Sequence, residues 1–162
     1  MEITYNDIPV SNQYLPPENT QIKPVVRLKG LDTNKLYTLI MYDPNAVKGN
    51  NIHWLVTDIH YKNIETGKVI LEYYGPHPPP KSGEHNYIFS LYESSKKKNN
   101  IILSERLIEL NELLKKLDIT GSPIYTKKFR SYIKRGSKKR YKTMQNKNKR
   151  KTKNIKTRRM KN

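Results

Sequence analysis

Apolar residues recur in short runs along the first 130 residues, with turn-forming residues between them. The runs predict β-strands at 25–28, 36–42, 52–59, 69–74 and 87–92. The run 52–59 is almost continuously apolar, which is typical of a central strand buried on both faces. Since the connections are too short for crossover helices, the pattern favours an antiparallel or mixed β fold over βαβ units.

One segment near the end of this region has a helical period instead. Leucines at 107, 110, 114 and 117 predict an amphipathic helix over 104–116 that packs on the β domain. A short final strand is predicted at 124–126, with Phe129 as the last anchor. Residues 1–24 are polar and rich in turn formers, so we expect a peripheral segment with room for one edge strand. The predicted fold class is therefore mostly β with few helices.

Charge divides the chain into two parts. All 14 Asp and Glu lie in residues 1–126 with 14 of the 32 Lys and Arg, so the other 18 basic residues, and the whole net charge of +18, belong to 127–162. A segment rich in like charges and poor in apolar residues does not bury enough surface to offset its ordering entropy. We therefore predict a globular domain at 1–130 and a basic, disordered tail at 131–162.

Composition also bears on the class of protein and its location. The chain has no cysteine, which excludes disulfides and thiolate metal sites. No apolar run approaches the roughly 20 residues of a membrane helix, and the N-terminus lacks the pattern of a signal peptide. We expect a cytoplasmic protein, with the nucleus as an alternative through the basic tail. The abundance of Asn, Lys and Ile is typical of an A/T-rich genome, such as a parasite or large virus, and a virion location follows if the source is viral.

Four polar side chains lie at the ends of predicted strands. Asp43 follows the strand 36–42, His53 opens the next, and His85 and Tyr87 begin the strand after the turn-rich segment 75–83. In an antiparallel sheet these positions can meet at one rim. Imidazole, phenol and freed backbone N–H groups suit an anion, and Asp43 would orient a histidine or accept from a ligand.

Other interpretations of these residues stay open. An Asp before Pro is usually a turn former, and a His or Tyr within a strand usually belongs to the core. Two His and one Asp could also form a metal triad, although the short spacing of a metal helix motif is missing. No nucleophile elbow or phosphate-binding P-loop is present, so we predict no enzyme and no cofactor; a phosphoester hydrolase using Asp43 and the histidines is the enzymatic alternative.

Three motifs, which follow one another along the chain, narrow the choice between these interpretations. They are Asp43-Pro44-Asn45-Ala46-Val47, then His53-Trp54-Leu55-Val56-Thr57-Asp58-Ile59, then Gly75-Pro76-His77-Pro78-Pro79 leading to Gly83-Glu84-His85-Asn86-Tyr87. Together they resemble the phosphatidylethanolamine-binding protein family, which includes the Raf kinase inhibitor proteins and the plant flowering regulators. The second motif is most similar to the plant branch.

This resemblance implies a fold, a site and a mode of action. The expected fold is a central antiparallel sheet packed on a smaller sheet, with a flanking helix. The expected pocket binds phosphate-type anions, including phosphoethanolamine-like phospholipid head groups and phosphorylated partners. By the resemblance, Asp43, His53, His85 and Tyr87 line that pocket, and Gly75 and Pro79 frame its mouth. Members act by binding, as regulators of kinases or transcription complexes, and not by catalysis.

The chain departs from the family pattern at several positions. Asn45 and Val47 replace an Asp and a Pro, and Asn86 replaces an Arg that often forms a structural ion pair. The loss of that Arg is expected to loosen its corner of the pocket. The C-terminal helix that closes the pocket in animal members has no counterpart, since the basic tail stands in its place. We therefore expect a more open and less selective mouth.

The tail supports a second functional hypothesis. Residues 127–162 have the density of positive charge that binds RNA, DNA or anionic lipid by counterion release, without sequence choice. Tyr141 could stack on a base. The alternative is a solvated tail with only weak affinity for polyanions.

Overall fold

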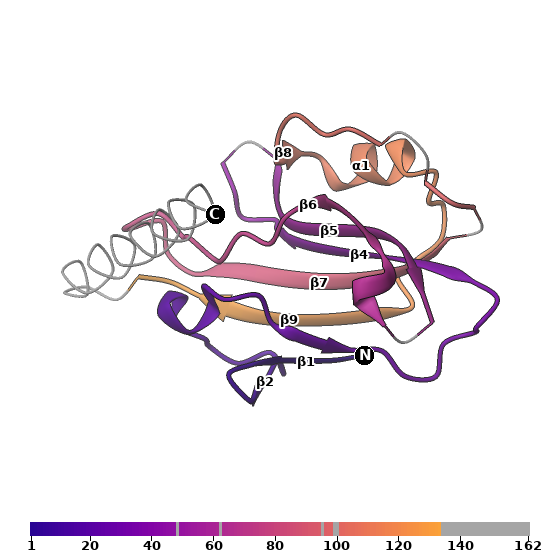
Figure 1. Cartoon of the computed structure of the whole chain (residues 1–162). Helices are drawn as coiled ribbons and strands as arrows, with labels where there is room; N and C mark the ends of the chain where they lie inside the picture. The colour runs from indigo at the N-terminus through magenta and orange to yellow at the C-terminus, as the bar shows by residue number, and fades with distance from the viewer. Residues whose placement is uncertain (48, 62, 95, 99–100, 134–162) are drawn as a thin grey trace, which may run out of the picture. The chain divides into compact units, whose positions relative to one another are not determined.

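The computed structural model describes residues 1–47, 49–61, 63–94, 96–98 and 101–133, and the chain divides into units Met1–Tyr132 and Ile133–Asn162. The first unit, to which all that follows refers, contains two antiparallel sheets (Figure 1). Its elements in chain order are β1 (Glu2–Tyr5), β2 (Ile8–Pro9), η1 (Pro17–Thr20), β3 (Val25–Arg27), β4 (Leu36–Asp43), β5 (Asn50–His60), η2 (Ile64–Thr66), β6 (Lys68–Leu71), β7 (His85–Ser94), β8 (Leu107–Ile108), α1 (Leu110–Lys116) and β9 (Tyr125–Ser131).

The large sheet has the order β6-β5-β4-β7-β9, and β8 adds to the beginning of β5. Strands β4 and β5 lie inside this order and pair antiparallel to each other along most of their length. Residues 52–59 of β5 are all buried, which agrees with the prediction of a strand covered on both faces. β-Branched and aromatic side chains in these strands suit such a pleated, enclosed surface.

Each face of the large sheet has its own hydrophobic core. One face carries Met41, Trp54 and Phe89 and packs against the small sheet, whereas the other carries Ile40, Leu55 and Tyr92 and packs against α1. Figure 1 shows the large sheet between α1 on one side and β1 and β2 on the other. Successive side chains of a strand point to opposite faces. Because each face has its own core, β4 and β7 carry apolar residues on both faces.

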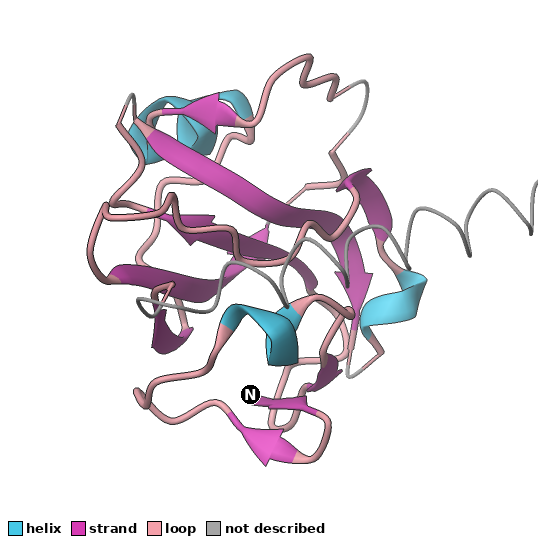
Figure 2. Ribbon diagram, turned by 90° about the vertical axis from the view of Figure 1, so that its left-hand side faces the viewer, coloured by secondary structure: helices cyan, strands magenta, loops and turns pink. Residues whose placement is uncertain are grey.

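The N-terminal segment is more ordered than predicted. It supplies β1, the central strand of a three-stranded sheet with the order β2-β1-β3, and the helix η1 (Figure 2). The segment then follows the edge strand β9: the N–H of Leu15 donates to the carbonyl of Arg130 (2.9 Å), and the N–H of Arg130 donates to Gln13 (2.9 Å). These bonds cover part of the β9 edge, which would otherwise present unpaired backbone groups.

The predicted helix 104–116 is wrong at its beginning. The observed helix α1 starts only at Leu110, and Leu107–Ile108 form β8, which pairs with Asn50 and Asn51 of β5. The carbonyl of Arg106 accepts from the N–H of Ile52 (2.8 Å), so this stretch is held extended by the large sheet. Tertiary pairing therefore overrides the leucine periodicity, and Leu107 is 48% exposed rather than part of the buried stripe.

Two strand predictions also differ from the structure. The strand predicted at 69–74 ends at Leu71, although the N–H of Tyr74 still donates to the carbonyl of His53 (2.8 Å). The strand predicted at 124–126 extends as β9 to Ser131, because it pairs with β7 from Leu91 back to His85. The predicted disorder of the tail concerns residues that, beyond 133, lie outside those described.

Among the helices described, none is long and apolar enough to cross a membrane.

Candidate functional site

Three polar residues from three strands meet at one rim of the large sheet. Asp43 ends β4, His85 begins β7, and His53 is the fourth residue of β5. The registers Asp43↔Asn51 and Tyr42↔Ile88 bring these strand ends side by side. All three side chains are buried, with exposures between 1% and 4%. Antiparallel pairing thus assembles a site from positions 42 residues apart in sequence.

Asp43 and His85 form the most direct contact of this site. The Nδ1 of His85 lies 2.7 Å from Oδ2 of Asp43, so the ring donates its Nδ1 proton to the carboxylate. The other carboxylate oxygen accepts the backbone N–H of Asn45 (2.8 Å), which closes the turn after β4. Asp43 is therefore both a turn former and the acceptor that orients His85.

Ser82, which the sequence did not single out, covers the other nitrogen of His85. Its Oγ lies 2.8 Å from Nε2 of His85 and 2.7 Å from the carbonyl oxygen of Pro79. The backbone N–H of Ser82 donates to the same carbonyl (3.2 Å). A ligand that approaches Nε2 of His85 therefore has to displace the Ser82 hydroxyl or bind through it.

His53 has a different hydrogen-bonding role from the one expected. Its Nδ1 lies 2.7 Å from the carbonyl oxygen of Tyr74, which can only accept, so the proton is on Nδ1. Burial lowers the pKa of His53 to about 4, against the raising effects of that carbonyl and of Asp43. The ring is neutral at pH 7, and its Nε2 accepts from the amide of Asn51 (3.2 Å). The expectation that His53 donates to an anion is thus corrected, because its one proton is held by Tyr74 and its Nε2 accepts from Asn51.

Aromatic rings enclose His53. Tyr87 is fully buried, its ring meets His53 edge-on at a centroid distance of 5.1 Å, and it stacks on Phe129 at 5.3 Å. Tyr74, which is 45% exposed, stacks on the ring of His53 at 5.8 Å and on that of His77 at 5.6 Å. Tyr87 is consequently a core residue that also forms a wall of the site, and Tyr74 forms a more exposed wall.

Arg106 holds the strands behind this site. Its guanidinium donates to the carbonyl oxygens of Ile52 (3.0 Å), His53 (3.2 Å) and Glu72 (2.8 Å), and it lies over the ring of Tyr74 at 5.6 Å. These bonds connect the start of β5 to the chain that leaves β6. The sequence placed Arg106 in a helix, so its role as a backbone clamp was missed; no local pattern indicates it.

Gly75 and Pro79 have structural roles in the loop between β6 and β7. A Cβ at Gly75 would lie 2.9 Å from both the Cα of Gln21 and the carbonyl oxygen of Thr20, so glycine permits the close approach of η1. The side chain of Gln21 also donates to the carbonyl of Pro76 (3.0 Å). Pro79 is exposed and supplies the carbonyl that holds Ser82. The N-terminal segment thus positions the loop that leads to His85.

The departures at positions 45 and 86 meet in the structure. Both the backbone N–H and the side-chain amide of Asn86 donate to Oδ1 of Asn45, at 2.9 Å and 3.2 Å. The expected loosening of this corner is therefore not found, because a neutral amide pair connects the two chain segments. Val47, by contrast, is 93% exposed.

Within the described residues, no group of three or more His, Asp or Glu side chains lies close enough to hold a metal ion.

Comparison with known proteins identifies relatives of this chain. The family model described as "Phosphatidylethanolamine-binding protein" matches residues 6–124. The chain belongs to the phosphatidylethanolamine-binding protein family. The match begins after β1, runs from β2 through α1, and includes Asp43, His53 and His85.

Individual relatives extend the family assignment. Protein BROTHER of FT and TFL 1 from Arabidopsis thaliana is 36% identical over 102 residues, which cover 57% of this chain and 56% of that protein. The matched part of this chain thus spans little more than half of that plant relative. The resemblance to plant members is confirmed at the level of sequence.

Solved structures confirm the fold. A carboxypeptidase Y inhibitor, in complex with its cognate proteinase, has a TM-score of 0.70 at 21% identity, covering 82% of each chain. A phosphatidylethanolamine-binding protein from Plasmodium vivax has a TM-score of 0.67 at 19% identity, covering 82% of this chain and 84% of that one. The mostly β fold with a central antiparallel sheet is therefore that of the family.

Proposed function

We propose that this protein is a non-enzymatic binding protein whose rim site takes a phosphate-bearing ligand, such as a phosphoethanolamine-type head group or a phosphorylated partner. The observation that carries the proposal is the buried contact between Asp43 and His85 beside the neutral ring of His53. Buried polar groups that are fixed in this way at a strand end are typical of a recognition site.

The ring nitrogens of His85 and His53 suggest a ligand that carries both a negative and a positive charge. The Nδ1 of His85 is held by Asp43, so its Nε2 is the ring atom that faces a phosphate oxygen once Ser82 is displaced. The Nε2 of His53 has a single lone pair, which already accepts from the amide of Asn51, so an ammonium or a protonated phosphate oxygen reaches it only by displacing that amide. Phosphoethanolamine carries a phosphate and an ammonium, so one small molecule can meet both ring nitrogens.

A conservative variant of His85 tests this site. In His85→Asn the amide nitrogen can still donate to Asp43, whereas the group that faces Ser82 is lost. Heteronuclear NMR of the full chain, with phosphoethanolamine as the probe, should show saturable shifts of the Gly83 and Asn86 amides. We expect His85→Asn to weaken this binding at least tenfold, which corresponds to about 1.4 kcal/mol.

His60→Asn is the matched control, because His60 lies at the other end of β5 and the chemical change is the same. It should leave the dissociation constant at Gly83 and Asn86 unchanged. Equal binding in wild type and His85→Asn would refute the site. Turnover of phosphoethanolamine would refute the non-enzymatic assignment and favour the phosphoester hydrolase.

We propose that the protein acts as a regulator by binding its partner. We propose a signalling protein such as a kinase as the macromolecular partner and the cytoplasm as the location. The exposed Val47 supports a mouth that is less selective than usual in the family.

A second function, binding of nucleic acid or another polyanion, is supported by the 18 basic residues of 127–162. Nucleic-acid affinity should fall steeply with salt, because each neutralised phosphate releases a counterion. A full-length variant with Gln at the five Lys and Arg positions of 147–153 should have a salt slope lower by roughly 4 on double-stranded DNA. An unchanged slope would show that this part of the tail makes no phosphate contacts.

A further inference from the structure

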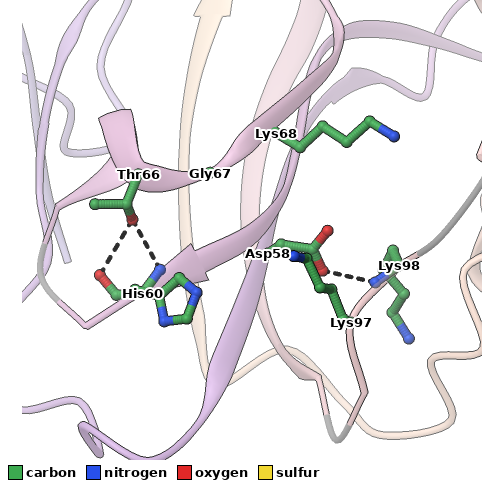
Figure 3. Close-up of a pocket in the computed structure, with 7 residues that line it drawn as sticks. All are labelled: Asp58, His60, Thr66, Gly67, Lys68, Lys97 and Lys98. Carbon is green, nitrogen blue, oxygen red and sulfur yellow. Dashed lines mark hydrogen bonds between the residues drawn. The ribbon is translucent and has the colours of Figure 1, made fainter.

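A polar cavity lies at the opposite end of β5 from the rim site. It has a volume of about 420 Å³ and is lined by Asp58, His60, Thr66, Gly67, Lys68, Lys97 and Lys98 (Figure 3). His53 and His60 are seven residues apart along one strand, so roughly 20 Å separates the two sites. The volume is within the range of small-molecule sites, roughly 300–1,000 Å³.

Lys98, which lines this cavity, is a buried lysine. The residue is 5% exposed, and its Nζ donates to the carbonyl oxygen of Asp118 (3.2 Å). None of the ion pairs between described residues includes Lys98. A buried ammonium needs an anionic partner or several hydrogen bonds to offset its desolvation, and one carbonyl satisfies only one of its three donors. Lys98 is therefore a cation with capacity for an anion.

Asp58 fixes the loop that carries Lys98 without neutralising the ammonium. Its Oδ1 accepts the backbone N–H of Lys98 (2.7 Å), and its Oδ2 lies 3.4 Å from the hydroxyl of Thr57. Its backbone φ of 56° is in the left-handed region, which Asp and Asn tolerate better than most residues. The carboxylate thus serves the turn, while it also opposes an anion in the cavity.

Two further lysines, Lys68 and Lys97, add charge to the cavity wall. Both are exposed, and neither takes part in an ion pair between described residues. Figure 3 shows Lys68 leaving the strand on one side of Asp58 and Lys97 and Lys98 following each other in the loop on the other. Three lysines against one aspartate leave a local charge of +2, with the histidine counted as neutral. Such a charge favours a dianion over a singly charged carboxylate.

We propose that this cavity is a second anion site, which binds a phosphate group with Lys98 as the buried anchor and Lys68 and Lys97 as the outer contacts. The phosphate is either free or carried by a small phosphomonoester, for whose organic part the cavity has room. The site is independent of the rim site: it uses different residues at the other end of the sheet.

Two substitutions that change the charge of the cavity in opposite directions test the proposal. The full chain is titrated by NMR with inorganic phosphate and, in a separate experiment, with glycerol phosphate. The readout is the amides of Gly67 and Lys98, which should shift saturably. Tighter binding of glycerol phosphate would identify the phosphomonoester, and equal binding would identify phosphate itself as the ligand. Lys97→Gln should weaken binding about threefold to tenfold, and Asp58→Asn should tighten it by a similar factor. Asn keeps both the acceptor for the Lys98 N–H and the tolerance of positive φ, so Asp58→Asn is expected to fold.

Lys128→Gln is the control for net charge, because Lys128 lies on β9 and is not in the cavity wall. It should leave the dissociation constant at Gly67 and Lys98 unchanged, as should His85→Asn. Loss of binding at Asn86 but not at Gly67 would therefore count against the rim site alone. The proposal is overturned if the Gly67 and Lys98 amides do not titrate, or if Asp58→Asn and Lys97→Gln do not shift the affinity in opposite directions.

Discussion

Burial of His53 predicts that the protein loses stability on acidification through one identifiable group. The pKa of His53 is about 4 in the folded protein, because burial disfavours the charged ring, against 6.5 in the unfolded chain. Between these values the unfolded chain binds more protons than the folded one. The free energy of unfolding therefore falls as the pH falls from 6.5 to 4, and the contribution is fully present above pH 6.5.

The size of this effect follows from the two pKa values. Each pKa unit corresponds to about 1.4 kcal/mol, so the fall from 6.5 to about 4 amounts to roughly 3 kcal/mol in total. About 2 kcal/mol of it is lost between pH 7 and pH 5. This is a large part of the roughly 5–15 kcal/mol that stabilises an ordinary domain.

The assay is urea unfolding of the full chain at pH 7, 6 and 5, for wild type and His53→Asn. The Asn amide can replace the donation of Nδ1 to Tyr74 but cannot titrate. His53→Asn is expected to be less stable at pH 7 because ring packing is lost, yet its free energy of unfolding should fall by about 2 kcal/mol less than that of wild type between pH 7 and pH 5.

Trp54→Phe is the control, since it destabilises the adjacent position of β5 without removing a titrating group. Its stability should decline with pH in parallel with wild type. If His53→Asn also runs parallel to wild type within a few tenths of a kcal/mol, His53 is not the buried neutral base described above, and the assignment of its Nε2 as an acceptor fails with it.

Three further substitutions test packing and hydrogen bonds, each by urea unfolding. Gly67→Ala should lower the free energy of unfolding by about 2–3 kcal/mol, because the new Cβ would lie 2.5 Å from Cγ1 of Val56 and 2.8 Å from the carbonyl oxygen of Thr57. Gly121→Ala is the control: its Cβ would have no atom within 4 Å, so the change should stay within about 0.5 kcal/mol. Equal costs for the two variants would contradict the packing argument. Arg106→Lys should cost about 1–3 kcal/mol, since an ammonium cannot reach all three carbonyls; a cost under about 0.5 kcal/mol would mean that the clamp contributes little. Asn45→Ala should lower the free energy of unfolding by about 1 kcal/mol. Asn86→Ala should cost less in the Asn45→Ala background than in wild type, as expected for a coupled pair. Strict additivity would show that the two amides act independently.

Local sequence carried most of the information about the strands. The continuous apolar run 52–59 predicted a doubly covered strand, and the structure has all eight residues buried. The strand end before Pro44 was also visible, because proline lacks a donor for the ladder. These features follow from the chemistry of adjacent residues, so no knowledge of the rest of the chain was needed.

Elements that depend on distant partners were predicted less well. Leucine spacing suggested that 104–109 is helical, but the free edge of β5 offers backbone bonds to Arg106 and Ile108 that a helix would forgo. The same applies to β9, whose length is set by pairing with β7, and to the small sheet, whose strands β1 and β3 are separated by about 20 residues. A short strand is stable only beside its partner, and the partner is not encoded locally.

The chemistry of the site shows the same division. Residue types and motif order were enough to select Asp43, His53, His85 and Tyr87 and to assign the family. Only the tertiary structure decided what each group does: His85 donates to Asp43, His53 is held neutral by burial and accepts, Ser82 covers His85, and Lys98 is buried beside a polar cavity. The physical reason is that a residue's type sets which hydrogen bonds and charges are available to it, whereas burial and partners from distant strands determine which of them are used.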